Sequence, residues 1–267
     1  MVIDFNGHLV PPEAVRIDPF DRGFTLGDGI FESLRVSGGA PEFADAHLDR
    51  LDRAAEVTAM PLPFTRPEIL DRMARLIAAA GMADGALRLM VSRGAAARGV
   101  AAPPPEDCRP TVVISVHPLP PTRNASVAAV IATVTRRNEF SPFSRVKAAP
   151  YLDSIVALEE AKGKNAQDAV LFNTQGRVAS ACYANLFAVI GGRLVTPPLA
   201  DGPLPGVTRG RVLAALDGVE DGISPDALAG AEEIFLTNSF GIRSVIALDG
   251  RPLPEGPMAA KARAIAG

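Results

Sequence analysis

The alternation of apolar and polar residues predicts a chain of two halves, each mixing strands with helices. Near the start, Asn6-Gly7 separates two short β-rich runs, and this dipeptide tolerates the positive backbone angles of a tight hairpin turn. Further strands of the first half are predicted at residues 31–36, 40–43, 86–92 and 111–116. The first half is therefore expected to contain a sheet that opens with a β-hairpin.

Two helices are predicted between these strands. The first covers residues 45–59 and carries Arg50. The second has Thr65 as its N-cap, Glu68 to complete a capping box, apolar residues at helical spacing and a glycine at its end. Because the apolar positions form one stripe, we expect the second helix to serve packing rather than chemistry.

A breaker-rich segment at residues 117–124 separates the two halves, because its prolines interrupt regular structure. We therefore predict an N-terminal lobe of residues 1–117, a linker of residues 118–125 and a C-terminal lobe of residues 126–267. In the second half, strands are predicted at 127–134, 168–172, 177–180, 185–190, 193–196, 233–237 and 244–248, and helices at 152–162, 208–216 and 257–266. Strands and helices in both lobes predict the α+β class.

Composition and charge restrict the partners that the protein can have. The chain of 267 residues has no Trp, only two Tyr and a formal charge of −3. Without a basic field or stacking aromatic residues, we expect no binding to nucleic acid. No apolar run approaches the roughly 18 residues of a membrane span, so we expect no membrane partner. A small-molecule substrate, including one with a phosphoryl group bound locally, fits this composition.

The N-terminus and the cysteines predict the compartment. The first residues lack both a basic start and an apolar core, so we expect no signal peptide. Cys108 and Cys182 are the only cysteines and lie far apart, without the paired framework of small secreted domains. Both features predict a protein of the reducing cytoplasm.

Lys147 is the first candidate for chemistry. A lysine attacks a carbonyl only when it is deprotonated, and its reference pKa of about 10.4 keeps it charged at neutral pH. The positive charge of Arg145 and the apolar Val146, Ala148 and Ala149 are the kinds of neighbour that lower this pKa. The three histidines, by contrast, match no metal-ligand spacing, so no metal site is predicted.

Five motifs occur in one order along the chain. They are Asp21-Arg-Gly with Gly27-Asp-Gly, His47-Leu-Asp-Arg50-Leu, Lys147-Ala-Ala-Pro-Tyr151-Leu, Asn185-Leu-Phe, and Leu204-Pro-Gly206-Val-Thr208-Arg. As a set, they resemble the class IV aminotransferases, the fold-type-IV enzymes that use pyridoxal 5'-phosphate (PLP). The resemblance covers residues 2 to about 250 and implies two α+β lobes, PLP in the interdomain cleft and a homodimer.

The resemblance gives individual residues a role. Lys147 is expected to hold PLP covalently and, once released, to move the α-proton of the substrate. Gly206-Val207-Thr208 stands where a helix begins, and the free N–H groups and dipole of such a helix favour a phosphate. By resemblance, Arg50 and Ser239 add a charge and a hydroxyl to the phosphate site, and Tyr151 lies beside the lysine and the ring.

Ser180 departs from the family pattern. Family members normally have a glutamate five residues before the Asn-Leu-Phe motif, where it keeps the pyridine nitrogen of PLP protonated. This chain has Ser180 there, five residues before Asn185. A hydroxyl only hydrogen-bonds, most naturally to a neutral nitrogen, so the ring should accept electrons less strongly. Ser180 therefore favours an elimination, which passes charge to a leaving group, over transamination.

Residues of the first half favour the same branch of the family. Ser33 offers a hydroxyl where branched-chain aminotransferases usually have Gly and aminodeoxychorismate lyases have Thr, and the loop from Arg93 to Arg98 resembles the lyase loop. Phe31, Ser33, Arg93 and Arg98 are the expected substrate-binding residues, with the arginines as bidentate partners of a carboxylate. The leading function is 4-amino-4-deoxychorismate lyase, which releases pyruvate and 4-aminobenzoate for folate synthesis.

Two alternatives stay open. The first is a transaminase of branched-chain or D-amino acids with 2-oxoglutarate or pyruvate as acceptor. The D-amino acid branch comes behind because its members normally have a Tyr where Phe31 stands and a His where Val100 stands. The second is a non-catalytic PLP-binding or scaffold protein, which the missing glutamate alone suggests.

Overall fold

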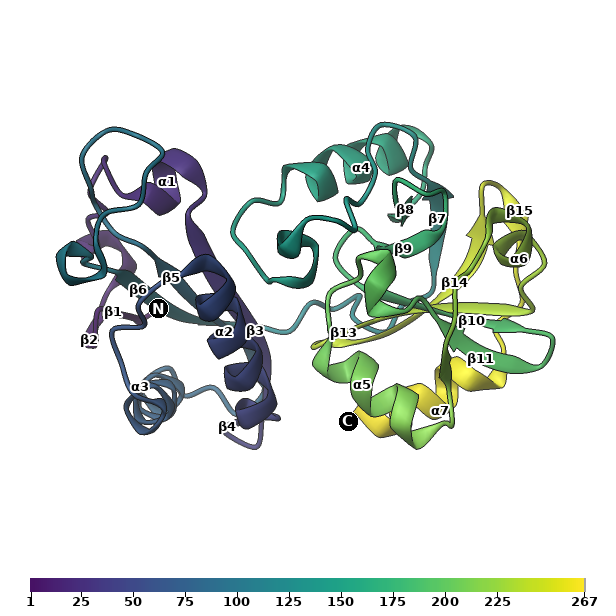
Figure 1. Cartoon of the computed structure of the whole chain (residues 1–267). Coiled ribbons are helices and arrows are strands. Elements are labelled where there is room, and N and C mark those ends of the chain that lie inside the picture. Colours follow the sequence, from purple (N-terminus) through teal and green to yellow (C-terminus); the bar gives the residue numbers. More distant parts are fainter. Residues whose placement is uncertain (267) are drawn as a thin grey trace. The chain divides into compact units, whose positions relative to one another are not determined.

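Two compact units make up the structure (Figure 1). The computed structural model describes residues 1–266 of the 267-residue chain. Unit 1 consists of Met1–Leu119 and Val146–Pro150, and unit 2 consists of Pro120–Arg145 and the chain from Tyr151 onward. Gly267, the last residue of the predicted C-terminal lobe, lies outside the described residues. Each unit combines strands with helices, which confirms the predicted α+β class.

Unit 1 is built on an antiparallel sheet. Its strands are β1 (Ile3–Phe5), β2 (His8–Val10), β3 (Gly29–Ser37), β4 (Ala40–Pro41), β5 (Gly85–Ser92) and β6 (Thr111–His117). They follow the order β2-β1-β6-β5-β3-β4. The predicted hairpin between β1 and β2 is confirmed, with Asn6 at φ 50° and Gly7 at φ 92°, the positive region that such a turn needs.

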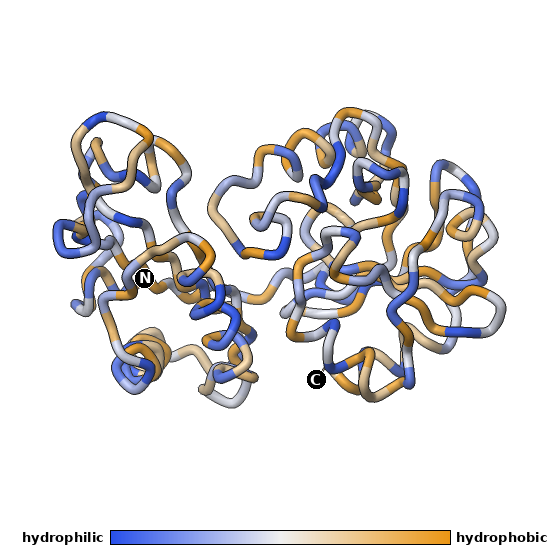
Figure 2. The backbone as a smooth tube through the Cα atoms, viewed as in Figure 1, coloured by the Kyte–Doolittle hydropathy of each residue, from blue (hydrophilic) through white to orange (hydrophobic). Residues whose placement is uncertain are grey.

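Two helices bury the apolar face of this sheet. The helices of unit 1 are α1 (Arg22–Leu26), α2 (Ala44–Thr58) and α3 (Arg66–Ala79), with short 3₁₀ helices at Pro12–Ala14 and Pro105–Asp107. The predicted capping box of α3 is present, formed by Thr65 and Glu68. Figure 2 shows hydrophobic and hydrophilic residues interspersed along α2 and α3, as helices with one buried side require. Core residues shared by these helices and the sheet are Leu34, Leu48, Leu51, Met73, Leu76 and Leu89.

The segment Val146–Pro150 belongs to unit 1, although the chain on both sides of it belongs to unit 2. The N–H of Phe31 donates to the carbonyl of Lys147 (2.9 Å), and the N–H of Ala149 donates to the carbonyl of Gly29 (2.8 Å). The segment therefore pairs with the start of β3. This corrects the sequence-based boundaries, which placed Lys147 in the C-terminal lobe, because a backbone pairing over so long a separation leaves no local pattern.

Unit 2 contains a larger, mixed sheet. Its strands are β7 (Val127–Ile131), β8 (Asp168–Phe172), β9 (Val178–Ala181), β10 (Asn185–Ile190), β11 (Arg193–Thr196), β12 (Val219–Glu220), β13 (Glu233–Asn238), β14 (Gly241–Leu248) and β15 (Arg251–Pro252). The main path is β12-β11-β10-β13-β14-β7-β8-β9, and β15 pairs with β14. The neighbours of β7 on both sides are parallel to it, whereas the hairpins β8–β9, β10–β11 and β13–β14 are antiparallel.

The helices of unit 2 pack on this sheet in two groups. They are α4 (Leu152–Gly163), α5 (Val207–Ala215), α6 (Pro225–Ala229) and α7 (Pro257–Ala266), with 3₁₀ turns at Pro142–Arg145 and Leu199–Asp201. Ala157 and Ala161 of α4 are buried against Leu171 of β8. On the other side α5 and α7 cover Phe187 and Phe235, whose rings stack at 5.2 Å between centroids. No helix within residues 1–266 is long and apolar enough to cross a membrane.

Candidate active site

The amine of Lys147 lies over the ring of Phe31, with 4.5 Å between Nζ and the ring centroid. Burial lowers the pKa of this amine from 10.5 to about 7, because removal from water disfavours the charged form. The positive charges of Arg50 and Arg88 act in the same direction, and the carboxylate of Glu32 opposes them. A large fraction of the amine is therefore neutral near pH 7, and the neutral amine is the form that attacks a carbonyl.

The charged neighbours of Lys147 differ from those expected. Proximity in sequence suggested Arg145, but Arg145 is exposed and belongs to unit 2. The charges that lower the pKa come from Arg50 on α2 and Arg88 on β5, which the fold alone brings near. The expected apolar setting is present, because Val146 and Ala148 pack into the core of unit 1.

Arg88 is a candidate site residue that the sequence analysis missed. It stands opposite Ser33 in the β3–β5 pairing, on the same sheet face as Phe31. Its guanidinium carbon lies 3.8 Å from the centroid of the Phe31 ring, so one ring contacts both cations. Arg88 is exposed, and a guanidinium beside a reactive lysine is the group type that binds a carboxylate. In the sequence, the position of Arg88 between the core-facing Leu87 and Leu89 already indicated that its side chain lies on the opposite face of the strand.

Glu32 is a second residue that the sequence analysis missed, and its side chain is buried. Its carboxylate accepts hydrogen bonds from Nε and Nη2 of Arg50 (2.8 and 2.7 Å) and from Nδ1 of His47 (2.8 Å). Burial favours a raised pKa for Glu32, but the hydrogen bonds from Arg50 and His47 outweigh it and lower the pKa to about 2. The sequence could have indicated Glu32, because it is an acid on the core-facing side of β3, where its neighbours on that side are Ile30 and Leu34.

Arg50 was expected at the phosphate of PLP. Its guanidinium is held on Glu32 by two hydrogen bonds, and the side chain is almost fully buried. The structure therefore fixes the orientation of Arg50 and places its charge where it acts on Lys147. A contact with phosphate stays a prediction.

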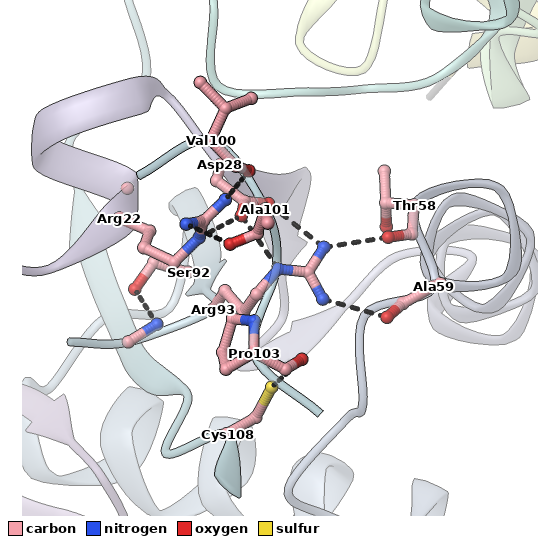
Figure 3. A network of polar contacts seen from close by, with 12 residues as sticks. Arg22, Asp28, Thr58, Ala59, Ser92, Arg93, Val100, Ala101, Pro103 and Cys108 are labelled. Carbon is pink, nitrogen blue, oxygen red and sulfur yellow. Dashed lines mark hydrogen bonds and ion pairs between the residues drawn. The ribbon is translucent and has the colours of Figure 1, made fainter. Parts of the chain in front are cut away.

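Asp28 organises the loop that carries the two predicted substrate arginines (Figure 3). Its carboxylate accepts from Nε of Arg22 (2.7 Å) and from Nε of Arg93 (2.8 Å). Arg22 also donates to the three carbonyls of residues 99–101 at 2.9 to 3.1 Å. Burial favours a raised pKa for Asp28, but hydrogen bonds from the two arginines outweigh it and lower the pKa. The network thus ties the loop to the start of β3.

The two loop arginines differ in their availability. Arg93 is buried and donates to Asp28 and to two carbonyls at the C-terminal end of α2, at 2.8 and 2.9 Å. These donors bind groups of the protein itself, and a contact of Arg93 with substrate stays a prediction. Arg98 is exposed and lines a pocket of about 380 Å³ together with Asp18 and Phe20. Arg98 is therefore the member of the pair that solvent and ligands can reach.

The start of α5 in unit 2 has the features of an anion site. Gly206 is the N-cap, and no side chain caps the helix, so the first N–H groups from Val207 onward are open to a ligand. A Cβ at Gly206 would lie 2.1 Å from Oδ1 of Asn185, so this close approach requires glycine. The hydroxyl of Thr208 donates to the carbonyl of Asn238 (3.0 Å). The buried hydroxyl of Thr237 has no hydrogen-bond partner within the described residues. These residues fit the phosphate of PLP.

Three further predicted PLP contacts lie in unit 2. Ser180 is buried on β9, where its hydroxyl accepts from Nε of Arg137 (3.3 Å). Ser239 is partly buried in the turn between β13 and β14. Tyr151 is the N-cap residue of α4 and is partly exposed. Their contacts with PLP stay predictions.

Each unit taken by itself supplies a feature that PLP chemistry uses: unit 1 has a desolvated lysine amine, and unit 2 has an uncapped helix that begins at a glycine. The family model for amino-transferase class IV matches residues 29–248. The chain therefore belongs to the class IV aminotransferases and uses PLP as its cofactor, as the sequence motifs predicted.

Relatives with different activities resemble the chain to a similar degree. A protein of Methanocaldococcus jannaschii that carries the provisional name branched-chain-amino-acid aminotransferase is 30% identical, over 94% of this chain and 89% of its own length. The aminodeoxychorismate lyase of Bacillus subtilis is 29% identical, over 89% of this chain and 83% of its own. The branched-chain aminotransferase of Thermoproteus uzoniensis, solved with norvaline, superposes with a TM-score of 0.93 at 26% identity, covering 100% of this chain and 93% of that one.

Proposed function

We propose that the protein is a lyase of this family, with 4-amino-4-deoxychorismate as its substrate and pyruvate and 4-aminobenzoate as its products. The observation that carries this proposal is Ser180, which stands where the family normally has a carboxylate for the ring nitrogen. A weaker electron acceptor suffices when the reaction has its own driving force, and loss of pyruvate from this substrate restores an aromatic ring. The reaction consumes one substrate and needs no amino acceptor.

Lys147 has the properties that the proposed chemistry requires. When bound, PLP supplies an aldehyde that condenses with amines and a ring that accepts electron density. Lys147 would hold the cofactor covalently and then, as a free amine, accept and return the α-proton of the substrate. A pKa of about 7 suits this work, because the amine exists in both protonation states near neutral pH. Arg88 and Arg98, both exposed, would bind substrate carboxylates.

The remaining cofactor roles are distributed over both units. Gly206, Val207 and Thr208 would bind the phosphate through the start of α5, with Ser239 adding a hydroxyl and Arg50 adding a positive charge. Tyr151 would lie beside the ring, and Ser180 would face its nitrogen. Phe31 and Ser33 would shape the substrate side of the unit 1 sheet.

We also propose that the protein acts as a homodimer in the cytoplasm. Each unit exposes large apolar side chains, among them Phe24 of α1 (79% exposed) and Leu152 of α4 (74% exposed). Surfaces of this kind favour association over a free monomer. Light scattering on the purified protein tests this, and a monomeric mass at micromolar concentration would contradict it.

Transamination of branched-chain amino acids is the second candidate. It is favoured by the relative from M. jannaschii and by the fold of the T. uzoniensis enzyme. A transaminase of D-amino acids is the weaker variant, because Phe31 and Val100 depart from the residues usual in that branch.

One pair of assays separates the two candidates. The purified protein with PLP is given 4-amino-4-deoxychorismate, and pyruvate and 4-aminobenzoate are quantified. In parallel it is given L-leucine, L-valine or D-alanine without an acceptor, and conversion of the PLP absorbance to that of pyridoxamine phosphate is followed. The lyase proposal expects equal amounts of the two products and little conversion. Full conversion by an amino acid, without release of 4-aminobenzoate, would refute it in favour of a transaminase.

A further inference from the structure

Arg137 in unit 2 is a cation whose side-chain hydrogen bonds all go to neutral groups around Ser180. Arg137 follows β7, and its backbone N–H is held by the carbonyl of Phe172 at the end of β8 (2.9 Å). Its guanidinium donates to Oγ of Ser180 (3.3 Å), to Oγ of Ser154 (3.2 Å) and to the carbonyl of Cys182 (3.1 Å). All three partners are buried and neutral. A positive charge is therefore fixed directly against the residue that replaces the family glutamate.

No carboxylate within residues 1–266 forms an ion pair with Arg137. Asp168 on β8 accepts hydrogen bonds from Nη2 of Arg243 (2.5 Å) and from the N–H of Cys182 (3.2 Å), and it forms its ion pair with Arg243. Burial and the charge of Asp168 raise the pKa of the Cys182 thiol to about 12, so the thiol adds no negative charge at neutral pH. Among the described residues, the guanidinium of Arg137 is thus the charged group that contacts the Ser180 hydroxyl directly.

The direction of the hydrogen bonds follows from the donor chemistry. A guanidinium has donors and no acceptor, so Oγ of Ser180 must accept from Arg137. The hydroxyl hydrogen of Ser180 then remains free to donate to another group. A pyridine nitrogen accepts such a bond only in its unprotonated form, and the nearby positive charge disfavours adding a proton to it.

We propose that Arg137 acts as a positioning residue that orients the Ser180 hydroxyl as a donor and keeps the ring nitrogen of PLP unprotonated in this enzyme. The inference rests on the proposed placement of that nitrogen at Ser180. It assigns to this chain a cationic partner for the ring, opposite in sign to the glutamate usual in the family. The substrate class that suits such a site is one whose own leaving group or aromatisation drives the reaction.

Nitrogen NMR tests the proposal directly. PLP labelled with ¹⁵N in the ring is bound to the full-length protein, and the chemical shift distinguishes a free pyridine from a pyridinium. The wild type is expected to show the unprotonated resonance at pH 7. S180E restores a carboxylate and should move the resonance to the pyridinium position. R137Q removes the charge and should move it in the same direction, whereas R137K should retain the wild-type position.

Arg136 provides the matched control. It is the neighbouring residue of the same type, is exposed, and donates to the carbonyls of Ala132 (2.6 Å) and Thr135 (3.1 Å). R136Q should leave the resonance unchanged. A pyridinium resonance in the wild type, or an S180E protein whose resonance stays unprotonated, overturns the proposal.

The experiment separates this inference from the proposed function. The same sample is reduced with borohydride and analysed by mass spectrometry. If the wild type carries no covalent PLP on Lys147, the proposed role of the lysine is contradicted. Covalent PLP on Lys147 together with a protonated ring nitrogen would contradict the role of Arg137 alone. An R137Q protein that keeps the unprotonated resonance would contradict the role of Arg137; should R137Q fail to fold, R137M removes the same charge and is measured in its place, with the same two outcomes.

Discussion

Replacing Arg88 by Gln should raise the pKa of Lys147. The Arg88 and Lys147 cations lie 3.8 and 4.5 Å from the centroid of the same Phe31 ring, which places them within about 8 Å of each other. At about 8 Å, two unit charges interact by about 0.5 kcal/mol in water and about 2 kcal/mol at the effective dielectric of a protein surface. Because one pKa unit corresponds to about 1.4 kcal/mol, R88Q should raise the pKa of Lys147 by roughly 0.4 to 1.5.

Replacing Glu32 by Gln should have the opposite effect. The Glu32 carboxylate favours the charged amine, and its removal also leaves the charge of Arg50 unbalanced. The pKa of Lys147 should therefore fall below 7. Breaking this buried pair should also reduce the free energy of unfolding by about 3–5 kcal/mol, so folding of E32Q must be verified by circular dichroism before the assay.

The assay measures the initial rate at which PLP attaches covalently to the apo-protein as a function of pH. Samples are reduced with borohydride and the adduct is quantified by mass spectrometry. An unperturbed lysine would be neutral in roughly one molecule in 2,500 at pH 7 and would give a midpoint near pH 10.4. The wild type should give a midpoint near pH 7, R88Q a higher one and E32Q a lower one.

Arg75 supplies the control for this series. It is an arginine on the surface of α3, where it pairs with Asp71 at 2.8 Å. R75Q should leave the midpoint of the wild type unchanged. The reasoning fails if R88Q and E32Q shift the midpoint in the same direction, or if R88Q and R75Q behave alike.

Two further substitutions test the scaffold of the site. G206A should weaken PLP binding at least tenfold in a fluorescence titration, because the new Cβ would collide with Asn185. The control is G210A in the same helix, which has open space around its new Cβ and should bind PLP normally. Equal PLP affinities of the two variants would contradict the phosphate assignment. D28N should lower the free energy of unfolding by about 1–3 kcal/mol and accelerate proteolysis at residues 99–101, because Arg22 and Arg93 lose a charged acceptor. The surface variant D71N should have neither effect. A loop that resists proteolysis in D28N as it does in the wild type would show that the bonds from Arg22 to the loop carbonyls are sufficient to hold it.

Local patterns predicted those elements whose determinants are close in sequence. The capping box at Thr65 and Glu68 and the hairpin at Asn6-Gly7 are present where they were expected, because caps and tight turns depend on a few neighbouring residues. The second half also follows its pattern closely: β11 (Arg193–Thr196) has the predicted bounds, and α4 differs from its prediction by one residue at its end. Short elements such as α1 and α6 were missed because they carry too few apolar positions to show a period.

The surroundings of the site depend on contacts between residues far apart in sequence, which local patterns do not show. Arg145 is two residues from Lys147, yet burial lowers the pKa of the amine most, and the charges that lower it further belong to Arg50 and Arg88, far away in sequence. Arg93 lies in a loop that resembles a substrate loop, but its guanidinium is buried on Asp28. Pairing of an arginine with a carboxylate can be recognised only when the fold shows which strands and helices meet.

At Ser180, sequence and structure complement each other. The sequence identified the missing carboxylate, and the structure supplied what stands in its place, since Arg137 contacts the same hydroxyl. No motif marks Arg137, because it follows β7 and reaches β9 across β8. A replaced residue is therefore best interpreted together with the groups that contact it.

The central claim is that the Lys147 amine carries PLP, and peptide mass spectrometry after borohydride reduction tests it most directly. The chain has four lysines, and Lys162, Lys164 and Lys261 are all exposed surface residues. We predict one PLP per chain, located on the peptide that contains Lys147, and no stoichiometric adduct in K147A. Adducts spread over the exposed lysines, with none on Lys147, would contradict the account.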